Sequence, residues 1–163
     1  YPLVILHTAD VSESALARLR DAASDLVQCE PIIVNDPRLA LLARPELNIS
    51  FTKLWAWTLT HYAKIVFLDA DVLVVANIDD LMARTAEFVA APDSGWPDIF
   101  NSGVFVATPA RATFDALCSR LAEFGSFDGG DQGLLNAHFG DAWRGDLAYR
   151  LPFTDNTTPS GAY

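Results

Sequence analysis

Apolar residues occur in short continuous runs along the chain, separated by polar segments that contain proline, glycine and aspartate. Apolar runs of about four to eight residues bounded by turn-forming residues are typical of strands, and runs without alternation are typical of strands buried on both faces of an α/β sheet. We expect the run that ends at Leu68 to lie at the centre of the sheet. The pattern predicts strands at residues 3–6, 27–34, 65–68, 88–91 and 100–106.

Helical spacing and capping residues predict helices between these strands. Ser12 is a candidate N-cap for a helix over residues 13–23. Ser50 or Thr52 can cap a helix over residues 51–62, which presents Leu54, Trp57 and Thr58 on one face and Lys53 on another. Residues 77–81 read as a short helical turn. A third long helix begins at Thr108 and Pro109, because threonine favours the N-cap and proline the first helical position.

Length and composition narrow the functional classes. A chain of 163 residues forms one domain with a substantial core. Although 51% of the residues are hydrophobic, no apolar run approaches the ~20 residues of a transmembrane helix, so we expect no membrane association. The 21 acidic against 11 basic residues give a net charge of −10, which argues against a nucleic-acid partner or an anionic membrane.

The cysteines and the N-terminus indicate a reducing compartment. Cys29 and Cys118 have no metal-ligand spacing, and both lie in apolar surroundings that favour small core residues over a disulfide. The N-terminus lacks a basic segment followed by a long apolar one, so nothing marks secretion. We therefore expect a cytoplasmic protein.

Asp69 and Asp71 follow the strand predicted at residues 65–68 and form the most informative polar pair. Ionised carboxylates are not buried in a core without a partner, so we place both at the carboxyl edge of the sheet, where open α/β sheets bind ligands. In an extended segment both side chains point to the same side. The pair therefore predicts a Mn²⁺ or Mg²⁺ site that neutralises a diphosphate, with two solvated acids at a strand end as the alternative.

Further polar residues lie at element ends later in the chain. A glycine-rich turn at residues 127–130 leads into a helix at Asp131, which reads either as an N-cap or as an acid beside a ligand. Asn101 and Ser102 stand at the entrance of a strand, where they can bind sugar hydroxyls or satisfy local backbone. Lys53 can reach the cation site if its helix packs beside that strand.

Seven segments, in this order, resemble the glycogenin branch of the family 8 retaining glycosyltransferases, which have a GT-A fold. The resemblance implies a GT-A, Rossmann-like, mixed and mostly parallel sheet flanked by helices. It covers the chain from about Arg44 to Phe153. The segments occupy residues 44–47, 52–55, 67–71, 76–81, 90–98, 100–105 and 125–133.

The resemblance also implies roles for individual residues. Asp69 and Asp71 match the Mn²⁺ ligands, and Asp131 matches the acid nearest the reacting centre. Tyr163 falls at the place of the tyrosine that receives the first glucose. Residues that match contacts to the sugar nucleotide are Arg44, Lys53, Ala70, Asn101, Ser102, Asp128 and Gln132.

The implied activity is transfer of glucose from UDP-glucose, with retention, to a tyrosine and then to a growing α-1,4-glucan. The resemblance further implies a homodimer and glycogen synthase as a partner. We expect residues 1–163 to be a single catalytic domain that lacks the family's N-terminal nucleotide-binding strand and loop. A C-terminal segment with the third metal ligand, a histidine, is also expected to be missing. Alternatives are a family 8 transferase with another acceptor, such as inositol or a cell-wall glycan, and a non-catalytic sugar-nucleotide-binding domain.

Overall fold

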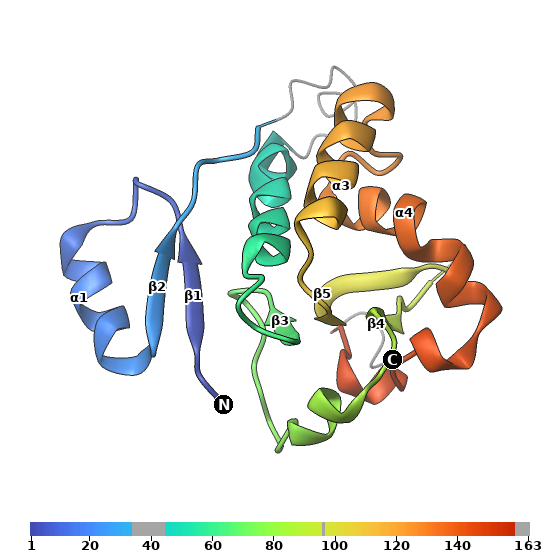
Figure 1. The fold of residues 1–163 in the computed structure, drawn as a ribbon, viewed down its shortest axis with the longest axis horizontal. Coiled ribbons are helices and arrows are strands. Elements are labelled where there is room, and N and C mark those ends of the chain that lie inside the picture. The colour runs from blue at the N-terminus through green and yellow to red at the C-terminus, as the bar shows by residue number, and fades with distance from the viewer. Residues whose placement is uncertain (34–44, 96, 159–163) are drawn as a thin grey trace.

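The computed structural model describes residues 1–33, 45–95 and 97–158 (Figure 1). Within these ranges no helix combines the length and the hydrophobicity that a bilayer span requires. The strands are β1 (Val4–His7), β2 (Asp25–Gln28), β3 (Ile65–Leu68), β4 (Phe88–Pro92) and β5 (Phe100–Ala107). The helices are α1 (Glu13–Ala22), η1 (Pro45–Thr58), η2 (Asp79–Ala83), α3 (Arg111–Phe124), α4 (Asp131–Gly145), η3 (Leu147–Tyr149) and η4 (Phe153–Asp155).

The N-terminal β1-α1-β2 unit forms a two-stranded parallel sheet at one side of the molecule (Figure 1). Ser12 caps α1 as predicted, since its hydroxyl accepts a hydrogen bond from the Ala15 amide. The second strand is shorter than the predicted 27–34. Its last link to β1 is the 2.8 Å bond from the Cys29 amide to the His7 carbonyl, because β1 itself ends there.

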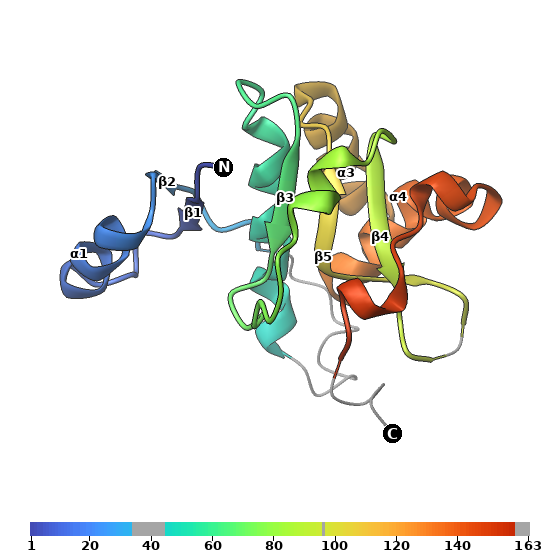
Figure 2. The same cartoon turned by 90° about the horizontal axis from the view of Figure 1, so that it is seen from below.

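The remaining strands form a three-stranded sheet in the order β3-β5-β4 (Figure 2). The predicted mixed α/β class is confirmed, but both pairings in this sheet are antiparallel, which corrects the expectation of a mostly parallel arrangement. The short connection between β4 and β5 allows only antiparallel pairing. The predicted central position of β3 is also wrong, because β3 lies at the edge of this sheet and is only half-buried.

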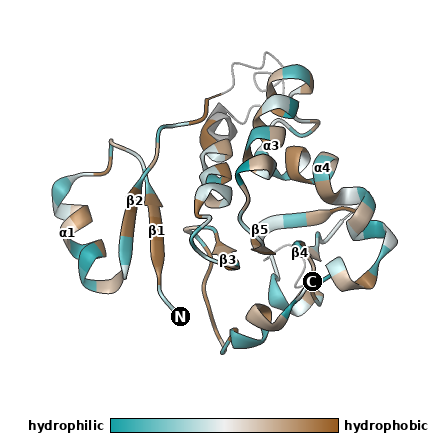
Figure 3. Ribbon diagram, in the orientation of Figure 1, coloured by the Kyte–Doolittle hydropathy of each residue, from teal (hydrophilic) through white to brown (hydrophobic). Residues whose placement is uncertain are grey.

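Two hydrophobic cores cover the two faces of the β4–β5 pair, which explains the continuous apolar runs of these strands. Successive side chains of a strand point to opposite faces. Phe88 and Phe105 pack with η1, α3 and α4 in the larger core, whereas Val89 and Val106 pack with Leu81 in the smaller one. In Figure 3, β1 is brown along its length, whereas the helices carry both teal and brown residues. Burial on both faces holds the strand ends in place.

Two helices begin elsewhere than predicted. η1 begins at Pro45, before the predicted caps, and proline suits a first helical position. α3 begins at Arg111 and not at Thr108, since the Thr108 amide donates to the Glu87 carbonyl and so remains extended beside the β4 strand. Leu54 and Trp57 of the predicted face still pack into the larger core, and η1 thereby directs Lys53 to the end of β3.

Candidate functional site

Lys53 joins the two acids that the sequence placed in separate segments. Its Nζ atom lies 2.9 Å from Asp69 Oδ1 and 2.7 Å from Asp131 Oδ2, and it also donates to the Ser102 carbonyl oxygen at 3.2 Å. The Lys53 and Asp131 side chains are only 8% and 10% exposed. The Phe67 ring lies 5.4 Å from the same ammonium. One buried cation therefore holds the ends of β3 and β5 and the start of α4 together.

The N-terminal half of α4 is anchored to the start of β5. Asn136 accepts from the Phe100 amide at 3.0 Å and donates to the Phe100 carbonyl at 2.8 Å. The N-cap of α4 is Gly130, which has no side chain to make a capping bond. The Asp131 carboxylate instead accepts from the Ser102 hydroxyl at 2.7 Å and pairs with Lys53. Asp131 is thus the first residue of α4 and not its N-cap, which corrects one of the two predicted roles, and its role beside a ligand stays a prediction.

Asp69 and Asp71 line one cleft of about 700 Å³ at the end of β3. They leave the strand in a turn, which the 3.1 Å bond from the Val72 amide to the Asp69 carbonyl closes, and not in the extended segment we expected. Asp71 is exposed and Asp69 is partly covered. Burial raises the pKa of the Asp69 carboxyl above its ordinary value, and the Lys53 ammonium opposes that rise. Both residues still line a common space.

The predicted residues of β5 and α4 form a connected hydrogen-bond network beside this cleft. The Ser102 amide donates to Gln132 Oε1 at 3.2 Å, and Gln132 Nε2 donates to Asp93 Oδ2 at 2.8 Å. Asn101 Oδ1 accepts from the Gly103 amide at 2.9 Å and lines the cleft. The network fixes the polar side chains against the backbone before any ligand binds.

Lys53, Asp69, Ser102 and Asp131 form the Lys53 cluster. Asp128 is not part of it and lies in the turn that precedes α4. Its Oδ1 atom accepts from the Ser126 hydroxyl at 2.8 Å and from the Gly130 amide at 2.9 Å. Gly129 has a φ of 79°, a conformation that favours glycine. The contacts seen for Asp128 therefore order the turn that presents Asp131.

The remaining predicted site residues are Arg44, Ala70 and Tyr163. Arg44 and Tyr163 lie outside the described residues. Ala70 is exposed in the turn between Asp69 and Asp71, and it is not among the residues that line the cleft.

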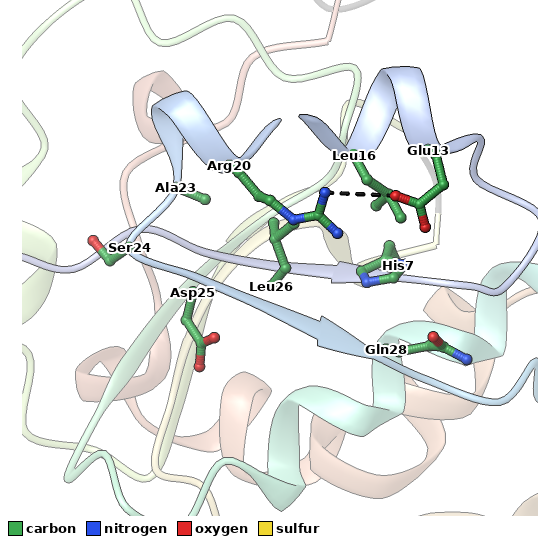
Figure 4. Close-up of a pocket in the computed structure, with 9 residues that line it drawn as sticks. All are labelled: His7, Glu13, Leu16, Arg20, Ala23, Ser24, Asp25, Leu26 and Gln28. Atoms are coloured by element: carbon green, nitrogen blue, oxygen red, sulfur yellow. Dashed lines mark ion pairs between the residues drawn. The ribbon is translucent and has the colours of Figure 1, made fainter. Parts of the chain in front are cut away.

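A second pocket, of about 500 Å³, lies between α1 and the strands β1 and β2 (Figure 4). Its lining includes His7 and Asp25, and an ion pair of 3.6 Å between Arg20 and Glu13 spans it. Both side chains of that pair are more than half exposed. None of the predicted site residues lines this pocket, so the cleft beside Asp69 is the candidate active site.

Comparison with known proteins identifies the family. The profile described as Glycosyl transferase family 8 matches residues 2–145. The chain belongs to glycosyl transferase family 8. The match includes β1 to β5 and α4, and with them every described residue of the Lys53 cluster.

Curated relatives of this family 8 chain include glycogenins. Glycogenin-1 of Mus musculus is 46% identical over 162 residues, which cover 99% of this chain and 48% of that protein. Glycogenin-2 of Homo sapiens is 48% identical over 162 residues, covering 99% of this chain and 32% of that protein. The chain thus spans about half or less of the length of these relatives.

A solved structure confirms the fold of this family 8 chain. The crystal structure of the glycosyltransferase GlyE in Streptococcus pneumoniae TIGR4 superimposes with a TM-score of 0.66 and 18% sequence identity. The match covers 94% of this chain and 38% of that chain. At this identity the likeness establishes the shared fold, including the predicted GT-A class.

The donor set of the family 8 cleft fits a hard divalent cation in part. Asp69 and Asp71 supply carboxylate oxygens, the ligand type that Mg²⁺ and Mn²⁺ prefer. Among the described residues, no group of three or more histidine, cysteine, aspartate or glutamate side chains is arranged to hold a metal. Water and substrate oxygens usually complete such a shell, so a pair of carboxylates is a sufficient start for a metal–diphosphate site.

Sequence reasoning missed three residues that shape the cleft. Asn156 donates to Asn101 Oδ1 at 2.8 Å from the segment after η4. Ser50 was considered only as a helix cap, but its hydroxyl accepts from the Asp131 amide at 3.1 Å. A side chain at Gly103 would stand 3.1 Å from Asn101 Oδ1, so glycine is needed for this close approach. A polar residue in a polar tail gives no sequence signal of its own, and only the returning chain path reveals Asn156.

Proposed function

We propose that this chain is part of a glycogenin-like glucosyltransferase. The enzyme transfers glucose from UDP-glucose, with retention at the anomeric carbon, to a tyrosine and then to a growing α-1,4-glucan. The observation that carries the proposal is the Lys53 ammonium between Asp69 and Asp131 beside a cleft. The Lys53 ammonium, which can bind a diphosphate, thus directly contacts the Asp131 carboxylate, which can act on the sugar. The identity of 46% to 48% with glycogenins supports the same substrates.

The donor diphosphate would bind at the end of β3. Asp69 and Asp71 would hold Mn²⁺ or Mg²⁺, and a metal bound there supplies charge neutralisation for the departing UDP. Lys53 adds a fixed cation where negative charge develops on the leaving group. Ala70 offers backbone contacts between the two carboxylates, and Arg44 is proposed as a further phosphate partner. The metal dependence of the enzyme is part of this proposal.

The glucosyl group would lie against the start of β5 and α4. Asn101, Ser102 and Gln132 offer amide and hydroxyl groups that suit sugar hydroxyls, and Asp128 orders the adjoining turn. The Asp131 carboxylate would stabilise positive charge at the anomeric carbon or attack it as a transient nucleophile. In either route the bond between that carbon and the diphosphate breaks, and a new bond forms to the acceptor oxygen, which loses its proton.

Several properties of the whole protein belong to the same proposal. Residues 1–163 are proposed to belong to one family 8 catalytic domain. The complete protein is proposed to be a cytoplasmic homodimer that hands its primer to glycogen synthase. The partial coverage of the relatives, 48% and 32%, supports the view that more chain takes part.

The test is intact-mass measurement of the complete protein after incubation with UDP-glucose and Mn²⁺. We expect a ladder of hexose additions, which Tyr163→Phe abolishes and Asp131→Asn slows by about a hundredfold or more. Asp115→Asn on the exposed face of α3 is the matched control and should leave the ladder unchanged. UDP release without hexose addition to the protein would indicate a different acceptor, either another glycan or inositol. If neither UDP release nor hexose addition is observed, the transferase proposal is wrong.

A further inference from the structure

The side-chain amide of Asn101 has one orientation that its neighbours allow. The Gly103 backbone N–H can only donate, so the Asn101 atom 2.9 Å from it must be the carbonyl oxygen Oδ1. Asn156 approaches the same oxygen at 2.8 Å and must therefore present its NH₂ group. Both acceptor positions of Asn101 Oδ1 are then filled. The Asn101 NH₂ group is left on the other side of the amide, with no protein partner among the described residues.

The Asn101 residue belongs to the lining of the candidate active site. Asn101, Asn156, Asp69 and Asp71 all line the same cleft. Asn156 Nδ2 would lie 3.8 Å from a Cβ atom at Gly103, and Asp69 Oδ2 would lie 3.5 Å from it. Both separations are ordinary van der Waals distances, so Gly103 lies directly beside the contact between Asn101 and Asn156.

We propose that Asn156 is a positioning residue, which holds the Asn101 amide with its NH₂ group turned into the cleft to donate to a hydroxyl of the transferred sugar. The proposal rests on the proposed glucosyl transfer and adds a residue to that site. Without Asn156, the Asn101 side chain keeps only its bond from Gly103 and rotates more freely. A donor that must be ordered at the moment of binding contributes less to affinity.

Two variants of Asn156 separate the lost bond from a reversed amide. Asn156→Ala removes one donor and should weaken UDP-glucose binding by about fivefold to tenfold, the value of one hydrogen bond. Asn156→Asp places a carboxylate oxygen opposite Asn101 Oδ1, so two acceptors repel each other. If the Asn101 amide flips to avoid this repulsion, its NH₂ group faces the Gly103 N–H, and two donors then oppose each other. This variant should therefore bind UDP-glucose more weakly than Asn156→Ala.

Calorimetry with UDP-glucose and with UDP distinguishes positioning from general damage. UDP lacks the sugar, so its affinity should change by less than about twofold in both variants, whereas a merely structural role would weaken both ligands alike. Adding Asn156→Ala to an Asn101→Ala protein should cost no further affinity for UDP-glucose, because Asn156 acts through Asn101. Asp115→Ala, which removes a 3.0 Å bond from Arg111 on exposed α3, is the control for loss of any single contact.

A stability cycle keeps this inference separate from the proposed function. Unfolding by urea of the wild type, both single alanine variants and the double variant measures the coupling between Asn101 and Asn156 without any ligand. Zero coupling, or equal weakening of UDP and UDP-glucose, overturns the positioning role. Measurable coupling in a wild-type protein that neither binds nor transfers from UDP-glucose overturns the proposed function and, with it, the sugar-directed part of the inference.

Discussion

Replacing Lys53 by methionine tests the central contact of the site. The substitution keeps the length of the side chain and removes only the ammonium between Asp69 and Asp131. Lys53 and Asp131 are 8% and 10% exposed, whereas Asp69 is 34% exposed. The Asp131 carboxylate would lose its cation in a largely dry environment, and Asp69 would be compensated in part by water.

The expected cost follows from these burial values. Removing one partner of a buried ion pair destabilises a protein by about 3–5 kcal/mol, because the remaining charge stays uncompensated. Most of that cost comes from Asp131, since solvent screens Asp69. For a domain of this size about 1 kcal/mol shifts Tm by roughly 2–4 °C, so Tm should fall by roughly 6–20 °C. Urea unfolding and calorimetry of the complete protein measure both quantities.

Two comparisons identify the cause of the loss. Adding Asp131→Asn to Lys53→Met removes the orphaned charge and should restore about 2 kcal/mol or more of the folding free energy. Arg111→Met is the exposed control: its partner Asp115 lies 3.0 Å away and both side chains are more than half exposed, so it should cost less than about 1 kcal/mol. If Lys53→Met unfolds at the wild-type urea concentration, the ammonium does not hold the two acids together and the reasoning is refuted.

Two further outcomes follow from local geometry and from burial. Gly133→Ala should destabilise by about 1–3 kcal/mol, because its Cβ atom would stand 2.7 Å from Asp128 Cγ, whereas Gly145→Ala meets nothing and should be neutral or slightly stabilising in the same urea assay. Equal effects of the two would contradict this. Burial lowers the pKa of His138 below its ordinary 6.5, so the unfolded chain takes up a proton first and stability falls as the pH drops below about 6.5. His138→Gln should flatten unfolding free energies measured between about pH 7.5 and 5.5, and an unchanged profile would argue against this role.

The elements that the sequence predicted best are those whose burial is uniform. β4 and the second half of β5 are covered on both faces, and the apolar runs at residues 88–91 and 104–107 lie within these strands. α1 carries its own start signal in Ser12, whose hydroxyl makes the capping bond. Errors occurred where a neighbour decides the boundary. The start of α3 moved to Arg111 because Thr108 pairs with Glu87, a partner that local sequence does not identify.

The site was predictable at strand and helix ends and unpredictable where the chain returns. Asp69 and Asp131 could be placed because an acid after a buried strand and an acid after a glycine-rich turn each limit the options. Their meeting through Lys53 depends on how η1 packs in the larger core. Asn156 had no such constraint: its role follows only from the 2.8 Å approach to Asn101.

The charges of the cleft indicate why a cation in addition to Lys53 is expected there. Lys53 offsets one of the two carboxylates that it contacts, and Asp71 adds a further negative group at the same edge. A diphosphate would bring still more negative charge, and two like charges about 4 Å apart near a protein surface repel each other by several times the thermal energy. This balance supports the metal that we propose for the cleft, because the fixed cation is already shared between two acids. The two charged groups therefore differ in their surroundings. Lys53 is paired with the protein's own acids, Asp69 and Asp131, whereas Asp71 is exposed and can contact a ligand of positive charge.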